Sequence, residues 1–342
     1  MAIVEPAPTK ILFIAVSRIG DTLFATPAMR AVATAFPGAD LHVLGHPKRA
    51  EVFRNLPFVR ESGSISKARA AWRGWLTGRK FDLAFVFGFD EALVRYAHRV
   101  SGRVVAFEQH DPVLNRRLLA AVPQPPFQSE HAVRQLLRLP AALGIPPAGL
   151  RVAFSVDDEE SAAARRRLTA SGVAANRPLV GLQVASFATK SYRDWPIENF
   201  AALCRRIAEQ WPQARFVIFG GPDEHERTAW LKRQLGERAV NFAGTLSLRQ
   251  TAAMMTLTDL YVGVDTGPTH IASAFDVPMV ALYHCLSSSR LTGPLEHPCA
   301  YLIDHPATAR DCSESSPMAE ISVDVVFATV RQALAEHPPR PR

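Results

Sequence analysis

Residues 260–283 read LYVGVDTGPTHIASAFDVPMVALY and place an acid, hydroxyls and a histidine beside glycine and proline. The β-forming run Leu260 to Val264 stops at Asp265-Thr266-Gly267-Pro268, and a helix is expected from Thr269. One interpretation is turn chemistry, in which Gly and Pro end the strand and Asp or Thr caps the helix. The other is an anion site at the helix N-terminus, with Asp265 and His270 contacting the bound group. Taken alone, His270 is more often structural.

A second candidate is SRIGD at 17–21, directly after another short β-rich run. It has one glycine and lacks the GxGxxG pattern that a dinucleotide site would need. Asp21 stands at the start of the expected helix, so its position alone favours an N-cap, worth about 1 kcal/mol. The functional alternative is a carboxylate that acts as a general base.

Two further loops carry charge. In SFATKSYRDWP (186–196), Lys190 and Arg193 precede Trp195-Pro196, where a helix is expected to begin. Two cations beside a helix N-terminus suit a diphosphate, although an ordinary capped loop would look the same. In GGPDEHER (220–227), Asp223 could accept hydrogen bonds from a ribose or cap the next helix.

The elements that would position these residues alternate between strand and helix. In the first half the sequence predicts strands at 10–16, 39–45, 81–88 and 104–108, with helices at 20–36, 48–56 and 91–100. In the second half it predicts strands at 178–185, 214–221, 240–244, 260–264 and 277–283, with helices at 197–210, 223–235 and 247–257, from 269, and at 323–336. Near-continuous apolar strands between helices indicate parallel sheets covered on both faces.

Residues 139–178 break this rhythm with prolines and a charged stretch, and they are expected to connect two domains. The predicted class is therefore α/β, with two doubly wound Rossmann-like domains at 1–155 and 156–342. Two such domains facing each other across a cleft are the architecture of GT-B glycosyltransferases. Ligands of such sheets bind beyond the carboxyl ends of the strands, where the loops above are placed.

Composition excludes several classes of protein. The chain has 342 residues, 48% of them hydrophobic and 21% charged, which is ordinary for a globular protein. The four cysteines show no CxxC spacing, so neither a zinc site nor a disulfide framework is predicted, and a reducing cytoplasm is expected. The apolar run 11–16 is too short to span a bilayer.

The basic residues are unevenly distributed along the chain. Residues 1–150 hold 19 Lys and Arg against 11 Asp and Glu, whereas residues 151–342 hold 20 against 21. The basic excess of the first half favours an acidic partner.

Together the motifs match one family. RIGD at 18–21 followed by TPAMRAVATAFPGADLHVL, K-SYR-DWP at 190–196 and DTGPTHIASAFDVPMVALY at 265–283 resemble glycosyltransferase family 9, the bacterial heptosyltransferases of lipopolysaccharide core assembly. The resemblance implies a GT-B fold and an inverting, metal-independent transfer, with ADP-L-glycero-D-manno-heptose as donor. No DxD pair follows a strand where a metal-dependent transferase would need one.

The resemblance also implies roles for individual residues. Two positions match catalytic residues: Asp21 matches the base, and Arg193 matches the cation that binds the diphosphate and stabilises its departing charge. Asp265 matches the acid that contacts the sugar. The other donor-binding positions are Thr189, Lys190, Asp223, Leu246, Thr266, Gly267 and His270.

The acceptor is expected on the basic N-terminal domain. The segment 66–81 places cations beside Trp72 and Trp75, which suits phosphorylated sugars at a membrane surface. The predicted acceptor-binding residues are Arg18, Lys67, Arg69, Arg73, Arg79 and Lys80. The expected partners are a phosphorylated lipid A core and the inner face of the cytoplasmic membrane, where the enzyme would be peripheral.

Alternatives remain open at this point. A hexosyltransferase or a nucleotide-sugar epimerase could share the fold, and the acceptor could be a protein. A nucleic-acid-binding protein is suggested by the net charge of +7, but the sequence contains no recognisable nucleic-acid-binding motif. Neither the position extended in the core nor the oligomeric state follows from the sequence.

Overall fold

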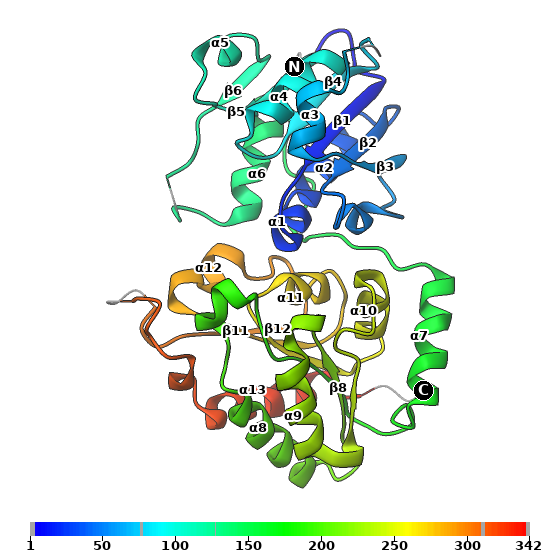
Figure 1. The fold of residues 1–342 in the computed structure, drawn as a ribbon, viewed down its shortest axis with the longest axis vertical. Coiled ribbons are helices and arrows are strands. Elements are labelled where there is room, and N and C mark those ends of the chain that lie inside the picture. Colours follow the sequence, from blue (N-terminus) through cyan, green and yellow to red (C-terminus); the bar gives the residue numbers. More distant parts are fainter. Residues whose placement is uncertain (1–3, 76–77, 127, 309–311, 340–342) are drawn as a thin grey trace. The chain divides into compact units, whose positions relative to one another are not determined.

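The computed structural model describes residues 4–75, 78–126, 128–308 and 312–339. The chain forms two compact units, Met1–Ser155 and Val156–Arg342, which we call the N-terminal and C-terminal units. Each unit contains a six-stranded sheet (Figure 1). Every strand pairing in the two sheets is parallel among the described residues.

The sheet of the N-terminal unit has the order β3-β2-β1-β4-β5-β6. Its strands are β1 (Lys10–Ala15), β2 (Asp40–Gly45), β3 (Glu61–Ser64), β4 (Phe81–Val86), β5 (Ser101–Phe107) and β6 (Ala120–Val122). The helices are α1 (Ile19–Phe24), α2 (Thr26–Ala35), α3 (Lys67–Trp72), α4 (Glu91–Val100), α5 (Pro112–Asn115) and α6 (Ala132–Ala141), with a 3-10 helix η1 (Ala50–Phe53).

The sheet of the C-terminal unit has the order β12-β11-β10-β7-β8-β9. Its strands are β7 (Leu179–Gln183), β8 (Arg215–Phe219), β9 (Ala239–Asn241), β10 (Leu260–Val264), β11 (Met279–Tyr283) and β12 (Ala300–Asp304). The α-helices are α7 (Asp158–Ala170), α8 (Ile197–Gln210), α9 (His225–Leu235), α10 (Leu248–Met255), α11 (Gly267–Ala272), α12 (Ser289–Thr292) and α13 (Val323–Glu336). The 3-10 helices are η2 (Ala188–Arg193), η3 (Pro222–Glu224), η4 (Gly236–Arg238), η5 (Cys285–Ser287) and η6 (Met318–Glu320).

Both sheets follow the same winding rule. Read along the chain, each unit places its first three strands on one side of the sheet and its next three on the other. The direction of winding therefore reverses between β1 and β4 in one unit and between β7 and β10 in the other. Doubly wound sheets bind ligands outside the carboxyl ends of the strands at this switch point.

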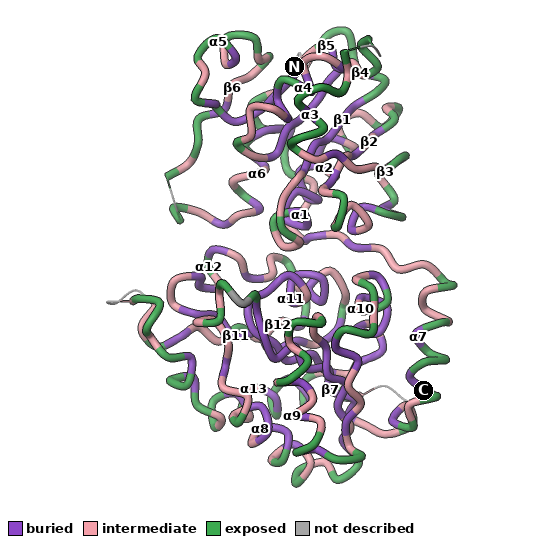
Figure 2. The backbone as a smooth tube through the Cα atoms, in the orientation of Figure 1, coloured by how far each residue is buried: buried purple, intermediate pink, exposed green. Residues whose placement is uncertain are grey.

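The cores explain why the strands are so apolar. The central strands β1, β7, β10 and β11 are buried almost throughout (Figure 2), because helices cover both faces of each sheet. In the C-terminal unit, alternate residues of β7 such as Val180 and Leu182 pack with Phe200 of α8, Leu231 of α9 and Val330 of α13.

Several predictions of local structure were wrong in detail. The helix expected over 20–36 is two helices, since Pro27 in the first turn of α2 has no N–H to continue α1. The helix expected over 48–56 is only the 3-10 turn η1, and Asn55 after it has a φ of 64°, which ends the helical path. The edge strands β3, β6 and β12 were missed for different reasons: β3 (ESGS) is polar, β6 (AAV) has only three residues, and β12 (AYLID) is a short apolar run, which periodicity alone does not identify as a strand.

The charged stretch expected to form part of the connection is helix α7. Asp157 and Glu160 form a reciprocal capping box at its N-terminus. Glu160 also binds Arg249 of α10, whose side chain is only 4% exposed. This ion pair fixes α7 to the C-terminal unit.

Candidate active site

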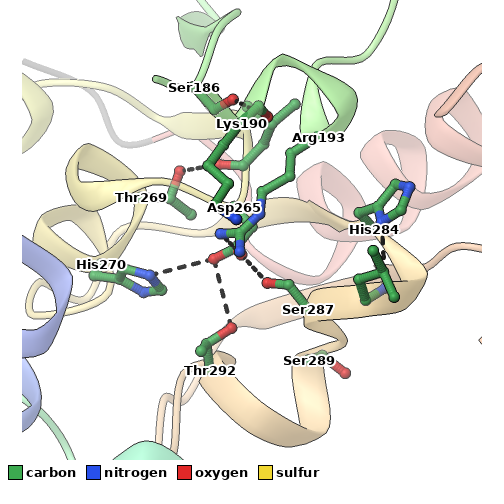
Figure 3. Close-up of polar contacts among 12 residues, drawn as sticks. Ser186, Lys190, Arg193, Asp265, Thr269, His270, His284, Ser287, Ser289 and Thr292 are labelled. Carbon is green, nitrogen blue, oxygen red and sulfur yellow. Dashed lines mark hydrogen bonds and ion pairs between the residues drawn. The ribbon is translucent and has the colours of Figure 1, made fainter. Parts of the chain in front are cut away.

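Asp265 is the centre of a polar cluster at the switch point of the C-terminal sheet (Figure 3). It follows β10 directly and is 1% exposed. Its Oδ2 atom lies 2.8 Å from Nη1 of Arg193, and its Oδ1 atom lies 3.3 Å from Nε2 of His270. The Ser287 hydroxyl donates to Oδ2, and the Thr292 hydroxyl lies 3.5 Å from Oδ1. The carboxylate thus holds four side chains, which come from η2, α11, η5 and α12.

The surroundings of Asp265 keep it ionised. Burial by itself raises the pKa of this carboxyl group. The hydrogen bond and the charge of His270, the charge of Arg193 and the Ser287 hydroxyl outweigh burial, so the pKa of Asp265 lies below its ordinary value. A buried carboxylate of this kind can fix the guanidinium of Arg193 and the imidazole of His270 for binding an anion.

A second acid, Asp194, shapes the loop that carries Arg193. Its Oδ1 atom accepts from the backbone N–H of Ser186 at 2.7 Å, and Arg227 of α9 contacts Oδ2. Sequence reasoning quoted Asp194 within K-SYR-DWP but gave it no role. The sequence did offer a signal for this role. Asp194 lies in a predicted loop eight residues after Ser186, and Asp side chains in loops often accept hydrogen bonds from nearby backbone groups.

The other predicted donor residues also follow strand ends. Thr189 and Lys190 lie in η2 after β7, Asp223 lies in η3 after β8, Leu246 follows β9, and Thr266 and Gly267 begin α11 after β10. These four strands are neighbours in the sheet. Thr189 and Asp223 are exposed and Lys190 and Leu246 are half-buried, whereas Thr266 and Gly267 are buried. The structure therefore brings the predicted positions to one edge of the sheet.

Helix α11 has only six residues, and the Thr266 side chain makes no capping hydrogen bond. Its N-terminus is therefore a weak anion site by itself, and the cations Lys190 and Arg193 would carry most of the attraction. A cavity of about 790 Å³ in the C-terminal unit lies at the opposite edge of the sheet, where Asp259, Pro278 and Cys299 mark the amino ends of β10, β11 and β12.

The cysteines differ from the sequence prediction, which included no disulfide. Cys285 and Cys312 form a disulfide, whereas Cys204 and Cys299 are free and buried. The bridge ties the segment after β12 to η5, which also carries Ser287. Sequence spacing gave no sign of it because tertiary structure brings the two residues together from 27 positions apart. With His284, these sulfurs form the one group of metal-like spacing among the described residues, but both sulfurs are used in the bridge.

In the N-terminal unit, Asp21 lies at the switch point between β1 and β4. It is the third residue of α1, and Arg18 occupies the N-cap position, so Asp21 is not the cap. The Ser17 hydroxyl donates to Oδ2 of Asp21 at 2.9 Å. The carboxylate is exposed and lines two pockets. An accessible, oriented carboxylate has the geometry of a general base.

The predicted acceptor residues divide into two groups. Arg18 and Lys67 line a pocket with Asp21, and Nζ of Lys67 lies 2.9 Å from Oδ2 of Asp90. The exposed residues Arg69, Arg73, Arg79 and Lys80 are not among the residues that line it. Sequence reasoning missed two basic residues that do line this pocket, His46 and Arg49.

Most of this chain is similar in sequence to a known protein family and its members. The model of glycosyltransferase family 9 (heptosyltransferase) matches residues 99–320. Lipopolysaccharide heptosyltransferase 2 of Salmonella typhimurium is 26% identical over 311 residues, which cover 84% of this chain and 86% of the relative.

Solved structures have the same fold. The glycosyl transferase family 9 protein from Veillonella parvula superposes with a TM-score of 0.82 at 19% identity, covering 98% of this chain and 99% of that one. The E. coli heptosyltransferase WaaC, solved with ADP-2-deoxy-2-fluoro heptose, gives a TM-score of 0.68 at 18% identity, covering 94% and 99%. At such identities the likeness shows the fold alone.

Two doubly wound parallel units with polar loops at their switch points are the GT-B fold. Because the family model matches well over half of the sequence, the chain belongs to glycosyltransferase family 9, the heptosyltransferases. The predicted fold class and family are thereby confirmed. No helix within the described residues is both long and apolar enough to cross a bilayer.

Proposed function

We propose that this enzyme transfers L-glycero-D-manno-heptose from ADP-heptose to the inner core of lipopolysaccharide, with Kdo-lipid A or a heptosylated core as acceptor. The observation that carries the proposal is the buried Asp265–Arg193–His270 cluster at the switch point of the C-terminal sheet. Support also comes from the relative named lipopolysaccharide heptosyltransferase 2 and from the heptosyltransferase solved with an ADP-heptose analogue.

The C-terminal unit would bind the donor. Arg193 and Lys190 would contact the diphosphate, with Thr266, Gly267 and His270 as further phosphate contacts. Asp223 and Leu246 would lie at the ribose and adenine, and Thr189 beside the phosphates. Asp265 would orient Arg193 and contact the sugar where a hydroxyl reaches it. Positive charge fixed at the leaving diphosphate stabilises the charge that grows there in the transition state.

The N-terminal unit would bind the acceptor. Asp21 would remove the proton of the acceptor hydroxyl, whose oxygen attacks the anomeric carbon from the face opposite the diphosphate. Inversion follows from this single displacement. The net charge of +8 over residues 1–150 suits a phosphorylated lipid A core and peripheral contact with the inner face of the cytoplasmic membrane.

We further propose that the reaction needs no metal. Arg193, Lys190 and His270 would neutralise the charge of the leaving diphosphate, which a bound metal ion neutralises in metal-dependent transferases. Treatment with EDTA should therefore leave the rate unchanged. A loss of activity that Mg²⁺ or Mn²⁺ restores would contradict this part of the proposal.

The test is direct transfer. The full-length protein is incubated with ADP-heptose and a panel of truncated core acceptors, and products are identified by mass spectrometry. ADP-glucose and UDP-glucose serve as competing donors. We expect a single heptose added to an inner-core acceptor, with inverted anomeric configuration by NMR. Transfer of a hexose, or of heptose only to protein, would instead support the alternative transferases.

A further inference from the structure

The disulfide between Cys285 and Cys312 is only partly buried. Both of its cysteines are half-buried, whereas the two free cysteines, Cys204 and Cys299, are buried. A thiolate that reduces a disulfide must reach one of the two sulfur atoms, so an accessible bridge exchanges with external thiols more readily than a buried one. Of the four cysteines in the chain, this pair is therefore the one that can respond to a thiol reductant.

The sulfur atoms of this bridge do not fit a metal site. Among the described residues the third potential ligand of the group is His284, whose Nδ1 atom lies 3.8 Å from Sγ of Cys285. Nδ1 accepts from the backbone N–H of Leu286 at 3.2 Å, and Nε2 therefore donates to the carbonyl oxygen of Ser316 at 3.0 Å. Both ring nitrogens are used within the protein. Opening the bridge would thus give two thiols and no third ligand.

The bridge is connected to the Asp265–Arg193–His270 cluster through Ser287. Ser287 follows Cys285 by two residues in η5, and its hydroxyl donates to Oδ2 of Asp265 (Figure 3). The same oxygen atom lies 2.8 Å from Nη1 of Arg193. A shift of η5 would therefore change the hydrogen bonding of the carboxylate that holds this guanidinium.

A second connection runs through the ring of His284, which directly precedes Cys285. This ring is fully buried and packs edge-on against Tyr192, with the two ring centroids 4.8 Å apart. Nζ of Lys190 lies 5.3 Å from the centroid of Tyr192, and Cζ of Arg193 lies 5.7 Å from it, which is within the range of cation–π contacts. The residue next to the bridge thus supports the ring that contacts both proposed diphosphate-binding cations.

We propose that the Cys285–Cys312 bridge is a thiol–disulfide switch of the donor site: the closed bridge holds the cations in place for the diphosphate, and its reduction weakens donor binding. This inference rests on the proposed function and adds a means of regulation to the same site. Under that function the enzyme works at the inner face of the cytoplasmic membrane, where thiols are kept reduced and disulfides are usually transient. A bridge in that place opens and closes with the redox state.

The switching step is thiol–disulfide exchange with a dithiol. One thiolate of the dithiol attacks one sulfur of the bridge and releases the other as a thiolate, which forms a mixed disulfide. The second thiol of the dithiol then displaces the remaining cysteine. The dithiol is oxidised to a disulfide, and its two electrons and two protons pass to Cys285 and Cys312. Noncovalent contacts, such as the His284–Ser316 hydrogen bond, then replace the covalent link between η5 and the segment after β12.

The test measures donor affinity in both redox states. The full-length protein is treated with oxidised or with reduced dithiothreitol, and ADP and ADP-heptose are titrated by calorimetry. Alkylation under denaturing conditions and mass spectrometry should detect two free thiols in the oxidised protein and four in the reduced one. We expect reduction to raise both Kd values by at least about fivefold, the lower end of the usual range for coupled sites. Circular dichroism verifies that both states are folded at the temperature of the titration.

Matched variants assign the response to the bridge. Cys204→Ala/Cys299→Ala keeps the bridge and removes the other thiols, so it should respond to dithiothreitol as the wild type does. Cys285→Ser/Cys312→Ser should bind ADP like the reduced wild type under both conditions. Equal affinities of the oxidised and reduced wild type, or a response of Cys285→Ser/Cys312→Ser to dithiothreitol, would overturn the switch.

Ser287→Ala tests the connection to the donor site. It should weaken ADP binding by the oxidised protein, and reduction should then cause a smaller further loss than in the wild type, because changes that act through one contact are not additive. Equal losses on reduction in the two proteins would overturn the coupling through Ser287.

These titrations involve no acceptor, so the two proposals fail separately. Absence of heptose transfer would contradict the proposed function alone. The switch is wrong if the oxidised protein binds no ADP, or if it binds ADP no more tightly than the reduced protein does.

Discussion

Oδ2 of Asp265 lies 2.8 Å from Nη1 of Arg193, although 72 residues separate the two in sequence. The Asp265 side chain is 1% exposed and the Arg193 side chain is 24% exposed. The buried carboxylate therefore holds a guanidinium that is partly accessible to a ligand. Only the pairing of β7 with β10 brings their loops together. This relationship assigns Asp265 a positioning role in the proposed donor site, besides its proposed contact with the sugar.

Asp265→Asn should weaken donor binding and stability together. The amide keeps the size of the side chain but leaves Arg193 without its anion. We expect the free energy of unfolding to fall by about 2 kcal/mol, below the range for fully buried pairs because Arg193 is partly exposed. The affinity for ADP-heptose should fall about tenfold, since the guanidinium loses its fixed position.

Urea unfolding and calorimetric titration with ADP-heptose measure the two effects. Asp324→Asn is the matched control, because Asp324 pairs with Arg206 in the same unit but is 81% exposed. Exposed pairs contribute about 0–1 kcal/mol. If both variants behave alike, the Asp265 pair does not organise the donor site.

Asp21→Asn should abolish most transfer without disturbing the donor. An amide oxygen still accepts from the Ser17 hydroxyl, so the geometry of α1 is kept. Loss of a general base costs roughly 10²–10⁴-fold in kcat. Single-turnover assays measure the chemical step, and calorimetry should show unchanged ADP-heptose affinity. Asp40→Asn, at an exposed position of the same unit, is the control. Near-wild-type turnover would remove Asp21 from the mechanism.

His98 should make stability depend on pH. Burial, together with the charges of Arg117, Arg79 and Arg95, lowers its pKa from 6.5 to about 4. The unfolded chain therefore binds a proton at a higher pH than the folded one. Stability from this residue is complete above pH 6.5 and is lost as the pH falls from 6.5 towards 4. The full loss is about 1–3 kcal/mol, since the side chain is only partly buried.

Urea melts of the wild type and of His98→Gln at pH 7.5, 6 and 5 test this dependence. The wild type should lose more stability than the variant across the series. His110→Gln, which removes an exposed histidine of the same unit, should follow the wild type. Parallel curves for all three proteins would contradict the assignment.

The Cys285–Cys312 bridge should stabilise the C-terminal unit. It closes a loop with a sequence separation of 27, which corresponds to about 3–4 kcal/mol if the constraint acts on the unfolded chain. A reducing agent should lower the Tm of the wild type. The double variant Cys285→Ser/Cys312→Ser should start at the lower Tm and show no response to reductant. A response of the double variant equal to that of the wild type would exclude the bridge as the cause.

Local sequence determined the elements that depend on periodicity and capping. The helix 197–210, the strand 260–264 and the helix 323–336 were predicted with the bounds that the structure has. Each is long or apolar enough for its own residues to decide its conformation. The loops after β1, β7 and β10 were also placed correctly at strand ends, because strand-ending glycine and proline are local signals.

Tertiary structure decided what depends on contacts between distant segments. The polar edge strand β3 and the three-residue edge strand β6 form because a neighbouring strand offers hydrogen bonds, and not because their own residues decide the conformation. The convergence of Arg193, His270 and Ser287 on Asp265 required the strand order β11-β10-β7. Asp21 and Arg49 likewise lie at one pocket only because β2 pairs with β1. The sequence determined which chemical groups these residues carry, whereas the strand order of each sheet determined which of the groups lie next to one another.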